Sequence, residues 1–323
     1  MMRKLLKTLL VALVLLQSCQ EDEIKPNTIG QEEEFSNEHK SAVYSLSNWM
    51  GAIDGNLILS QFTIPGTHDS GARFDHAILS GTAKCQDLTI GQQLESGTRF
   101  LDIRCRHYYD SFTIHHGVVY QQMNFDDVLN YCFNFLDANP SETIIMSVKK
   151  EHTDEGNTQS FEATFDGYVA ANPNRWYLAE NVPALKDVRG KIVLLRRFGA
   201  SNIPKGINAS AWQDNTTFEM NTSQANIKVQ DKYTVPNNND KWNDVEGLLN
   251  EAKANSSDKL YINFESGYKP GWFGIPSIPT VSNFINPKIE GYFTPQKYGR
   301  FGILVMDFAE STKNNLIVQS NFQ

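Results

Sequence analysis

The sequence has no apolar run long enough to cross a bilayer, little cysteine, and fewer basic than acidic residues. Its four cysteines fit no zinc-binding spacing. Lys and Arg number 29 against 37 Asp and Glu, which gives a formal net charge of -8. This balance argues against broad nucleic-acid binding and against a polybasic membrane patch. No repeat, low-complexity tract or linker marks a second domain, so a single domain is predicted.

The first forty residues indicate export rather than a fold. An apolar run over residues 9–16 follows a basic start, and it is too short to span a bilayer. The next residues, Leu16-Gln17-Ser18-Cys19, resemble the lipobox of bacterial lipoproteins, in which the cysteine is lipidated. A plain secretory signal is the alternative. We expect an exported lipoprotein of the bacterial outer membrane or cell surface, with a signal peptide (1–18), a flexible acidic stalk starting at lipidated Cys19 (19–41) and a catalytic domain (42–323).

The three remaining cysteines are Cys85, Cys105 and Cys132. Export permits a disulfide, but three thiols can form at most one pair. Buried free thiols are the favoured interpretation, and one disulfide is the alternative.

Six short apolar runs have the composition of buried strands. They are nearly continuous rather than alternating, which is typical of parallel strands covered on both faces. Residues 124–137 place their apolar side chains on one helical face, and Asn139-Pro140 then ends the helix. Strands that alternate with helices predict an α/β fold. The predicted strands are 62–64, 99–104, 143–148, 191–195, 260–264 and 302–307.

Polar side chains gather at or just beyond the carboxyl ends of these strands. In a (β/α) barrel that end of the sheet carries the active site. The stretch 200–245 is polar and poorly periodic, so a barrel would be irregular there. The polar residues concerned are Asp102, Arg104, Lys149, Arg196, Arg197, Asn263, Glu265 and Asp307.

Four short motifs carry groups suited to catalysis. Each one alone has an ordinary structural explanation, such as a satisfied histidine or a structural ion pair. Together they supply two imidazoles, a guanidinium and several carboxylates, which is the inventory that phosphodiester cleavage requires. The motifs are Gly66-Thr67-His68-Asp69-Ser70, Leu101-Asp102-Ile103-Arg104, Ile114-His115-His116-Gly117 and Met306-Asp307-Phe308.

These motifs, in this order, resemble bacterial phosphatidylinositol-specific phospholipase C. The resemblance continues through residues 139–147, 189–195, 229–233, 260–264 and 285–287, and so covers nearly all of the chain after the N-terminal segment. It implies an irregular (β/α)8 TIM-like barrel that cleaves phosphatidylinositol through inositol 1,2-cyclic phosphate. A GPI anchor is the implied second substrate.

The resemblance also implies roles for the histidines. His68 would be the general base that takes the proton of the inositol 2-hydroxyl, and Asp307 would orient it. His116 would be the general acid that protonates the departing diacylglycerol oxygen, with Asp69 as its partner.

Arg104 bears on the cofactor question. By the resemblance it binds the phosphate oxygens, while Asp102 positions Arg104 or the 2-hydroxyl. Calcium-dependent relatives place a metal where this family places an arginine. The resemblance therefore implies that neither a metal nor another cofactor is needed.

The resemblance implies that four side chains contact the inositol ring: Lys149, Arg197 and Asp231 at the hydroxyls, and Tyr233 stacked on the ring. Three alternatives stay open. Lys149 could form a solvated pair with its neighbour, Arg196 could take the role of Arg197, and Asp231 could be structural.

Membrane contact is predicted at the aromatic loop 268–276. Trp272 and Phe273 would insert at the bilayer interface, and packing of this loop against its neighbour is the alternative. The family often has a second apolar element for membrane insertion soon after the first histidine, but here that segment, 73–87, is only mildly apolar. A monomer is expected.

Two other functions are compatible with parts of the pattern. A metal-dependent glycerophosphodiester phosphodiesterase would show paired acidic ligands in place of Arg104. A non-catalytic protein that binds inositol or GPI glycans could lose a histidine or the arginine, yet His68, Arg104 and His116 are all present.

Overall fold

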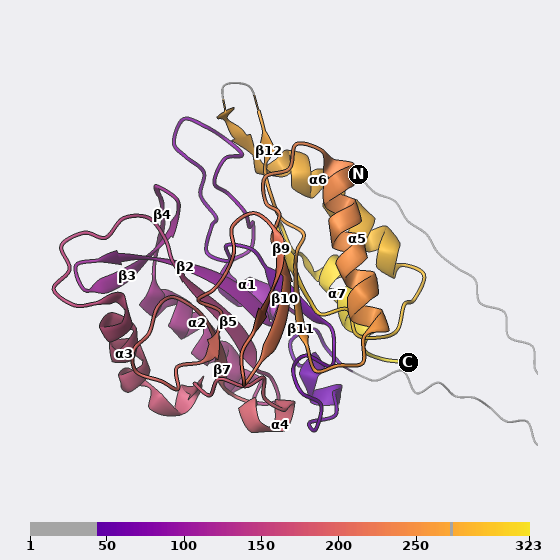
Figure 1. The fold of residues 1–323 in the computed structure, drawn as a ribbon, viewed down its shortest axis with the longest axis horizontal. Coiled ribbons are helices and arrows are strands. Elements are labelled where there is room, and N and C mark those ends of the chain that lie inside the picture. The colour runs from indigo at the N-terminus through magenta and orange to yellow at the C-terminus, as the bar shows by residue number, and fades with distance from the viewer. Residues whose placement is uncertain (1–43, 272–273) are drawn as a thin grey trace, which may run out of the picture. The chain divides into compact units, whose positions relative to one another are not determined.

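The structure is a computed structural model that describes residues 44–271 and 274–323. The predicted signal peptide, the stalk, Cys19, Trp272 and Phe273 lie outside these residues, and what was predicted for them stays a prediction. Within the described chain, strands and helices alternate, and most strands join one curled sheet (Figure 1).

The strands are β1 (Ile64–Thr67), β2 (Phe100–Tyr108), β3 (Ser111–His116), β4 (Val119–Asn124), β5 (Ile144–Lys150), β6 (Trp176–Tyr177), β7 (Ile192–Arg197), β8 (Ile207–Asn208), β9 (Thr217–Asn221), β10 (Asn226–Gln230), β11 (Leu260–Phe264), β12 (Lys269–Pro270), β13 (Pro276–Ser277) and β14 (Ile303–Met306). The α-helices are α1 (Ile90–Glu95), α2 (Phe125–Ala138), α3 (Phe161–Ala171), α4 (Leu185–Val188), α5 (Asn238–Ala254), α6 (Ile278–Phe293) and α7 (Ser311–Gln319). The 3₁₀ helices are η1 (Trp49–Ala52) and η2 (Pro173–Arg175).

The sheet runs in the order β6-β7-β5-β2-β1-β14-β11-β10-β9. Its neighbouring pairs are parallel except β9 with β10, while β3 and β4 extend β2 as an antiparallel hairpin. Five predicted strands overlap β2, β5, β7, β11 and β14, and the predicted helix overlaps α2. The sixth, 62–64, was placed too early, because it shares only Ile64 with β1. The predicted α/β class is confirmed. The barrel is irregular because, in the described part of the chain, no ladder joins β6 or β8 to β9.

Successive residues of each strand enter different parts of the core. Ile303 and Val305 of β14 belong to a cluster shared with β5, β7, β10 and β11, inside the curl of the sheet. Leu304 and Met306 pack instead against α5, α6 and α7. The outward residues of β2 and β5 pack against α1, α2 and α3. Both helical groups cover the outer face of the curled sheet, along different strands (Figure 1), while the inner-facing residues pack on one another within the curl. This explains why the strands are apolar on both faces.

The stretch 200–245 is irregular, as predicted, but it is not devoid of strands. β9 alternates exposed and buried residues, with Phe218 and Met220 inside. This alternation suits an antiparallel edge strand, so a search for continuous apolar runs misses it.

The N-terminal ends of β2 and β5 are joined by a buried ion pair. Arg99 lies 2.8 Å from Glu142, and both side chains are fully buried. Arg99 also donates to the carbonyl oxygens of Leu46 and Ser47. Because a buried charge needs its partners, this cluster holds residues 44–50 against the end of the barrel opposite the site described below.

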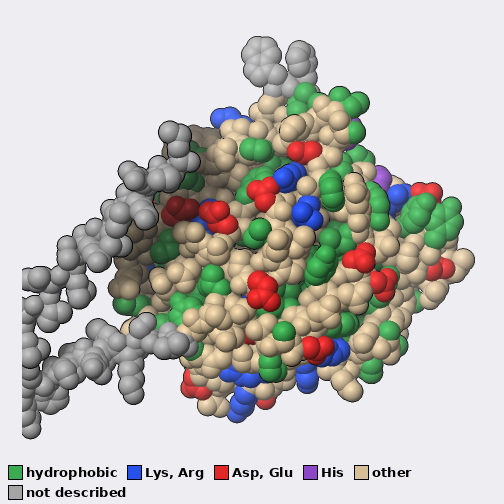
Figure 2. All heavy atoms as spheres, turned by 180° about the vertical axis from the view of Figure 1, so that it is seen from behind, with side chains coloured by type: hydrophobic (Ala, Val, Ile, Leu, Met, Phe, Trp, Pro, Cys, Tyr) green, Lys and Arg blue, Asp and Glu red, His purple; other side chains and the backbone are tan. Residues whose placement is uncertain are grey.

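The surface in Figure 2 shows acidic and basic side chains interspersed rather than separated by sign. No helix among the described residues combines the length and apolar character that a membrane crossing requires.

Candidate active site

A cavity of about 590 Å³ opens at the carboxyl ends of the parallel strands. The structure brings seven of the predicted site residues to its wall. They are His68, Arg104, His116, Lys149, Arg197, Asp231 and Tyr233. Three predicted carboxylates, Asp69, Asp102 and Asp307, are buried next to these residues.

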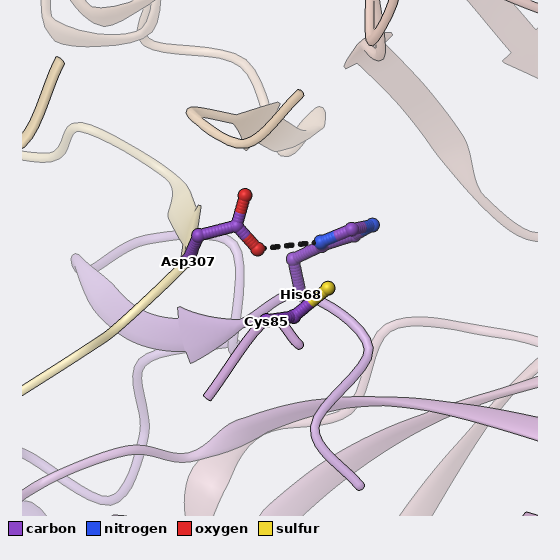
Figure 3. A group of neighbouring side chains, drawn as sticks. All are labelled: His68, Cys85 and Asp307. Carbon is purple, nitrogen blue, oxygen red and sulfur yellow. Dashed lines mark hydrogen bonds and ion pairs between the residues drawn. The ribbon is translucent and has the colours of Figure 1, made fainter. Parts of the chain in front are cut away.

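His68 follows β1, and Asp307 follows the neighbouring strand β14. The register pairs Thr67 with Met306, so the two side chains leave adjacent strand ends together. His68 Nδ1 lies 2.7 Å from Asp307 Oδ1 (Figure 3). His68 Nε2 lies 2.8 Å from Arg104 Nη2. A guanidinium only donates, so Nε2 must be the acceptor and Nδ1 must carry the proton donated to Asp307. The geometry therefore fits a neutral His68.

Arg104 projects from β2 between two buried carboxylates. Its Nε lies 3.2 Å from Asp102 Oδ2 and 3.7 Å from Asp69 Oδ2. Burial alone would lower the pKa of Arg104, but Asp102 and Asp69 outweigh it and raise that pKa well above its usual value. Burial likewise favours the neutral form of Asp102, yet Arg104 and Arg197 hold its pKa below the usual range. Arg104 and Asp102 therefore form a fully charged pair.

His116 ends β3 and faces His68 across the cavity. The ring centroids are 6.3 Å apart, and the ring planes lie at 87°. His116 Nδ1 is 2.7 Å from the carbonyl oxygen of Ala83 and 3.8 Å from Asp69 Oδ2. The hydrogen bond of this nitrogen thus goes to a backbone carbonyl, while Asp69 lies at ion-pair distance. Burial, and then Arg104, lower the pKa of His116.

Asp69 is buried, and neither of its carboxylate oxygens has a hydrogen-bond partner among the described residues. Its backbone has a φ of 37°, in the left-handed region that Asp and Asn adopt more readily than most residues. Burial raises its pKa to about 7, although Arg104 and His68 oppose the shift. Between the usual carboxyl pKa and about 7, the folded protein therefore holds a proton at Asp69 that the unfolded chain has lost.

This shift predicts a pH-dependent effect of Asp69→Asn on stability. The carboxyl has an ordinary pKa in the unfolded chain and a pKa of about 7 in the folded protein. Stability should therefore fall as the pH rises between these values. Asparagine suits the left-handed backbone and never ionises. In urea unfolding from pH 4.5 to 7.5, the variant should gain stability relative to the wild type as the pH rises. A constant difference across this range would contradict the shift.

The far wall of the cavity is built around Arg197. Its guanidinium carbon lies 3.7 Å from the ring centroid of Trp212, and Nη1 lies 3.3 Å from Asp102 Oδ1. Trp212 Nε1 donates to Asp231 Oδ2 at 2.9 Å. Arg196, the alternative considered for this role, points away and donates to the carbonyl oxygens of Lys205 and Phe198. Strand alternation thus selects Arg197 as the cavity residue.

Lys149 and Tyr233 each have an acidic partner at this wall of the cavity. Lys149 lies 3.2 Å from Glu151, so its partner is not the adjacent lysine. Arg104 and Lys149 outweigh burial and lower the pKa of Glu151 to about 2. The Tyr233 hydroxyl donates to Asp214 at 2.7 Å. That hydrogen bond, followed by burial, raises the Tyr233 pKa to about 12.

The sequence reasoning missed Glu151 and Trp212 as cavity residues. Glu151 lies two residues beyond Lys149, directly after β5, and this strand-end position was an available signal. Trp212 lies in a loop between β8 and β9. No periodicity marks it, so only the folded arrangement reveals its contact with Arg197.

Comparison with known proteins identifies the family. Residues 62–198 match the family model described as "Phosphatidylinositol-specific phospholipase C, X domain". A 1-phosphatidylinositol phosphodiesterase of Staphylococcus aureus strain Newman is 37% identical over 282 residues, which is 83% of this chain and 90% of that relative. The chain belongs to the phosphatidylinositol-specific phospholipase C family. A 1-phosphatidylinositol phosphodiesterase of Listeria monocytogenes is 29% identical over 289 residues, 84% of each chain.

Solved structures of this phospholipase family show the same fold. A mutant of the Staphylococcus aureus phosphatidylinositol-specific phospholipase C has a TM-score of 0.78 and 35% identity, covering 86% of this chain and 98% of that one. The Listeria monocytogenes enzyme has a TM-score of 0.71 and 26% identity, covering 87% and 100%. The predicted family, its enzyme class and the irregular TIM-like barrel are thereby confirmed.

Cys85 lies beside the candidate site. Its thiol lies within 4.8 Å of ligand atoms of His68 and Asp307, and likewise of Asp69 and His116. Figure 3 shows that His68 and Asp307 already bond to each other. Cys85, Cys105 and Cys132 are free and buried, as predicted.

Proposed function

We propose that this protein cleaves phosphatidylinositol to diacylglycerol and inositol 1,2-cyclic phosphate. One observation carries the proposal: His68 and His116 face each other in one cavity, with Arg104 between carboxylates beside them. This arrangement offers a base, an acid and a phosphate-binding cation at one place.

His68 starts the reaction as the base. When the bound phosphate draws Arg104 Nη2 away from His68, the freed Nε2 accepts the proton of the inositol 2-hydroxyl, and the resulting oxygen attacks phosphorus. The bond from phosphorus to the diacylglycerol oxygen breaks, and that oxygen takes a proton from His116. Asp307 holds the His68 ring through Nδ1 and stabilises the imidazolium that forms.

His116 has one nitrogen free for this donation. Its Nδ1 bonds to the Ala83 carbonyl, which leaves Nε2 for the leaving oxygen. Burial and Arg104 lower the pKa of His116 in the free protein. A bound phosphodiester anion acts in the opposite direction, because an opposite charge favours the protonated imidazole.

Arg104 would bind the phosphate oxygens, with its position fixed by Asp102 and by Asp69. Lys149, Arg197 and Asp231 line the cavity where inositol hydroxyls would bind, and Tyr233 lines the same cavity. Paired charged groups suit a ring of hydroxyls, and a site built to bond hydroxyls rejects molecules that lack them.

We expect the reaction to proceed without a metal ion. Arg104 supplies the positive charge that a divalent ion would otherwise supply, and it already lies beside the buried carboxyl groups of Asp102 and Asp69. Excess EDTA should therefore leave the initial rate of phosphatidylinositol cleavage within about twofold of the untreated rate. An EDTA-induced loss that added calcium restores would overturn this part of the proposal.

Phosphorus NMR of the products separates this function from its rivals. Phosphatidylinositol vesicles incubated with the protein should yield inositol 1,2-cyclic phosphate as the first soluble product. A linear phosphate whose release stops in EDTA would indicate a metal-dependent phosphodiesterase. Binding without any product would indicate a non-catalytic inositol-binding protein.

The surroundings of the enzyme form a further part of the proposal. The lipobox resemblance supports a lipoprotein anchored through Cys19 at the bacterial outer membrane or cell surface. We further propose that it acts as a monomer on membrane lipid or GPI anchors. Exposed Ile275, beside Trp272 and Phe273 in the chain, and Ile78 support an apolar rim for bilayer contact. One structure of the Staphylococcus aureus enzyme is described by the modulation of its membrane binding.

A further inference from the structure

The loop between β1 and α1 folds around one carboxylate. Asp75 Oδ1 accepts the backbone N–H groups of Thr82, Ala83 and Lys84 at 3.1, 3.0 and 2.9 Å. Asp75 Oδ2 accepts the N–H of Gly81 at 2.8 Å. These bonds outweigh partial burial and lower the pKa of Asp75. The carboxylate therefore closes the loop by satisfying four donors at once.

The returning end of this loop contacts both histidines. The Ala83 carbonyl accepts the hydrogen bond of His116 Nδ1 at 2.7 Å. Three residues later, Gln86 Nε2 donates to the backbone carbonyls of His68 and Met306, each at 2.8 Å. Ala83 and Gln86 are buried, whereas Ile78 at the tip of the loop is 85% exposed. The position of the Ala83 carbonyl thus depends on how the loop is closed.

We propose that Asp75 is a positioning residue for His116. By bonding to the N–H of Ala83 and its neighbours, Asp75 fixes the carbonyl that orients the His116 ring and keeps its Nε2 directed into the cavity. The inference rests on the proposed function, because it assigns Asp75 to the step in which His116 protonates the leaving oxygen. It predicts that loss of Asp75 impairs this step selectively.

The leaving group provides the test. A diacylglycerol alkoxide needs a proton as it departs, whereas p-nitrophenolate is stable without one. Asp75→Ala should lower kcat for phosphatidylinositol about tenfold or more, and change kcat for p-nitrophenyl inositol phosphate by less than about threefold. KM should change little for either substrate. His116→Ala, measured alongside, should show the same selectivity with a larger loss.

Two matched variants control for damage to the loop. Asp75→Asn keeps an oxygen for Thr82, Ala83 and Lys84 and loses only the bond to Gly81, so its selectivity should lie between those of the wild type and Asp75→Ala. Asp87→Ala removes an exposed carboxylate of the same loop whose ion-pair partner, among the residues that the structure describes, is half-buried Lys84, so it should leave both rates unchanged. If Asp75→Ala shows no cooperative thermal transition, the selectivity of Asp75→Asn between the two substrates tests the inference instead.

The outcomes are distinct. Selective loss in the Asp75 variants supports the inference. Equal loss on both substrates, or no loss, overturns it even if His116→Ala is selective. Absence of selectivity in His116→Ala would overturn the acid assignment and this inference together. Absence of turnover in the wild type would overturn the proposed function itself.

Discussion

Replacing His68 or His116 by alanine should reduce kcat for phosphatidylinositol roughly 100-fold or more, the scale of losing a general base or acid. The two losses should differ with the leaving group. The 2-hydroxyl must lose its proton whatever group departs, so His68→Ala should fail on the p-nitrophenyl substrate as well. His116→Ala should retain most activity there.

Initial rates with both substrates, measured on folded variants, check this prediction. His152→Ala provides a matched control, because His152 is exposed and does not line the cavity. Its rates should equal those of the wild type. Near-normal rates in both His68→Ala and His116→Ala would show that the two-histidine assignment is wrong.

Arg104→Lys should cost about as much as a histidine loss, although the charge is retained. Arg104 directs Nε to Asp102 and Nη2 to His68 Nε2, 3.2 and 2.8 Å away. A lysine ammonium donates from one nitrogen only, so it cannot bond to the carboxylate and to the phosphate oxygens from separate, fixed positions as a guanidinium does. Loss of one preorganised donor to a developing charge typically costs 10²- to 10³-fold in kcat, so we expect a reduction of roughly 100-fold.

The matched control is Arg106→Lys on the same strand. Arg106 does not line the cavity and donates to the carbonyl oxygen of Thr153 and to Glu155. Steady-state kinetics should show a large kcat loss for Arg104→Lys and little change for Arg106→Lys. A lysine variant with full activity would mean that charge alone suffices and that the fork geometry has no role.

Much of the site follows from strand position. Parallel strands place their carboxyl ends together, and alternation puts every second side chain on one face. Asp102 and Arg104 share a face for this reason, and Arg197 rather than Arg196 enters the cavity. The sequence therefore predicts which strand ends supply the chemistry.

Other features could not be predicted, because they depend on loops and on the backbone. Asp69 was predicted as the partner of His116, yet the hydrogen-bond acceptor is the Ala83 carbonyl. A carbonyl oxygen occurs in every residue, so sequence patterns do not single one out. Trp212 and the Asp75 loop become visible only when chain segments without periodicity are folded over the barrel.

Strand β9 is another feature that local sequence patterns do not predict. Continuous apolar runs predict the parallel strands, but β9 alternates and pairs antiparallel with β10. Its pairing is set by tertiary contacts rather than by local composition.

A crystal structure with bound myo-inositol 1-phosphate would examine the site most directly. The phosphate should lie between the two imidazoles and accept from the Arg104 guanidinium, with the ring hydroxyls toward Lys149, Arg197 and Asp231. A phosphate bound away from Arg104, or held by a divalent ion in its place, would contradict the proposed chemistry.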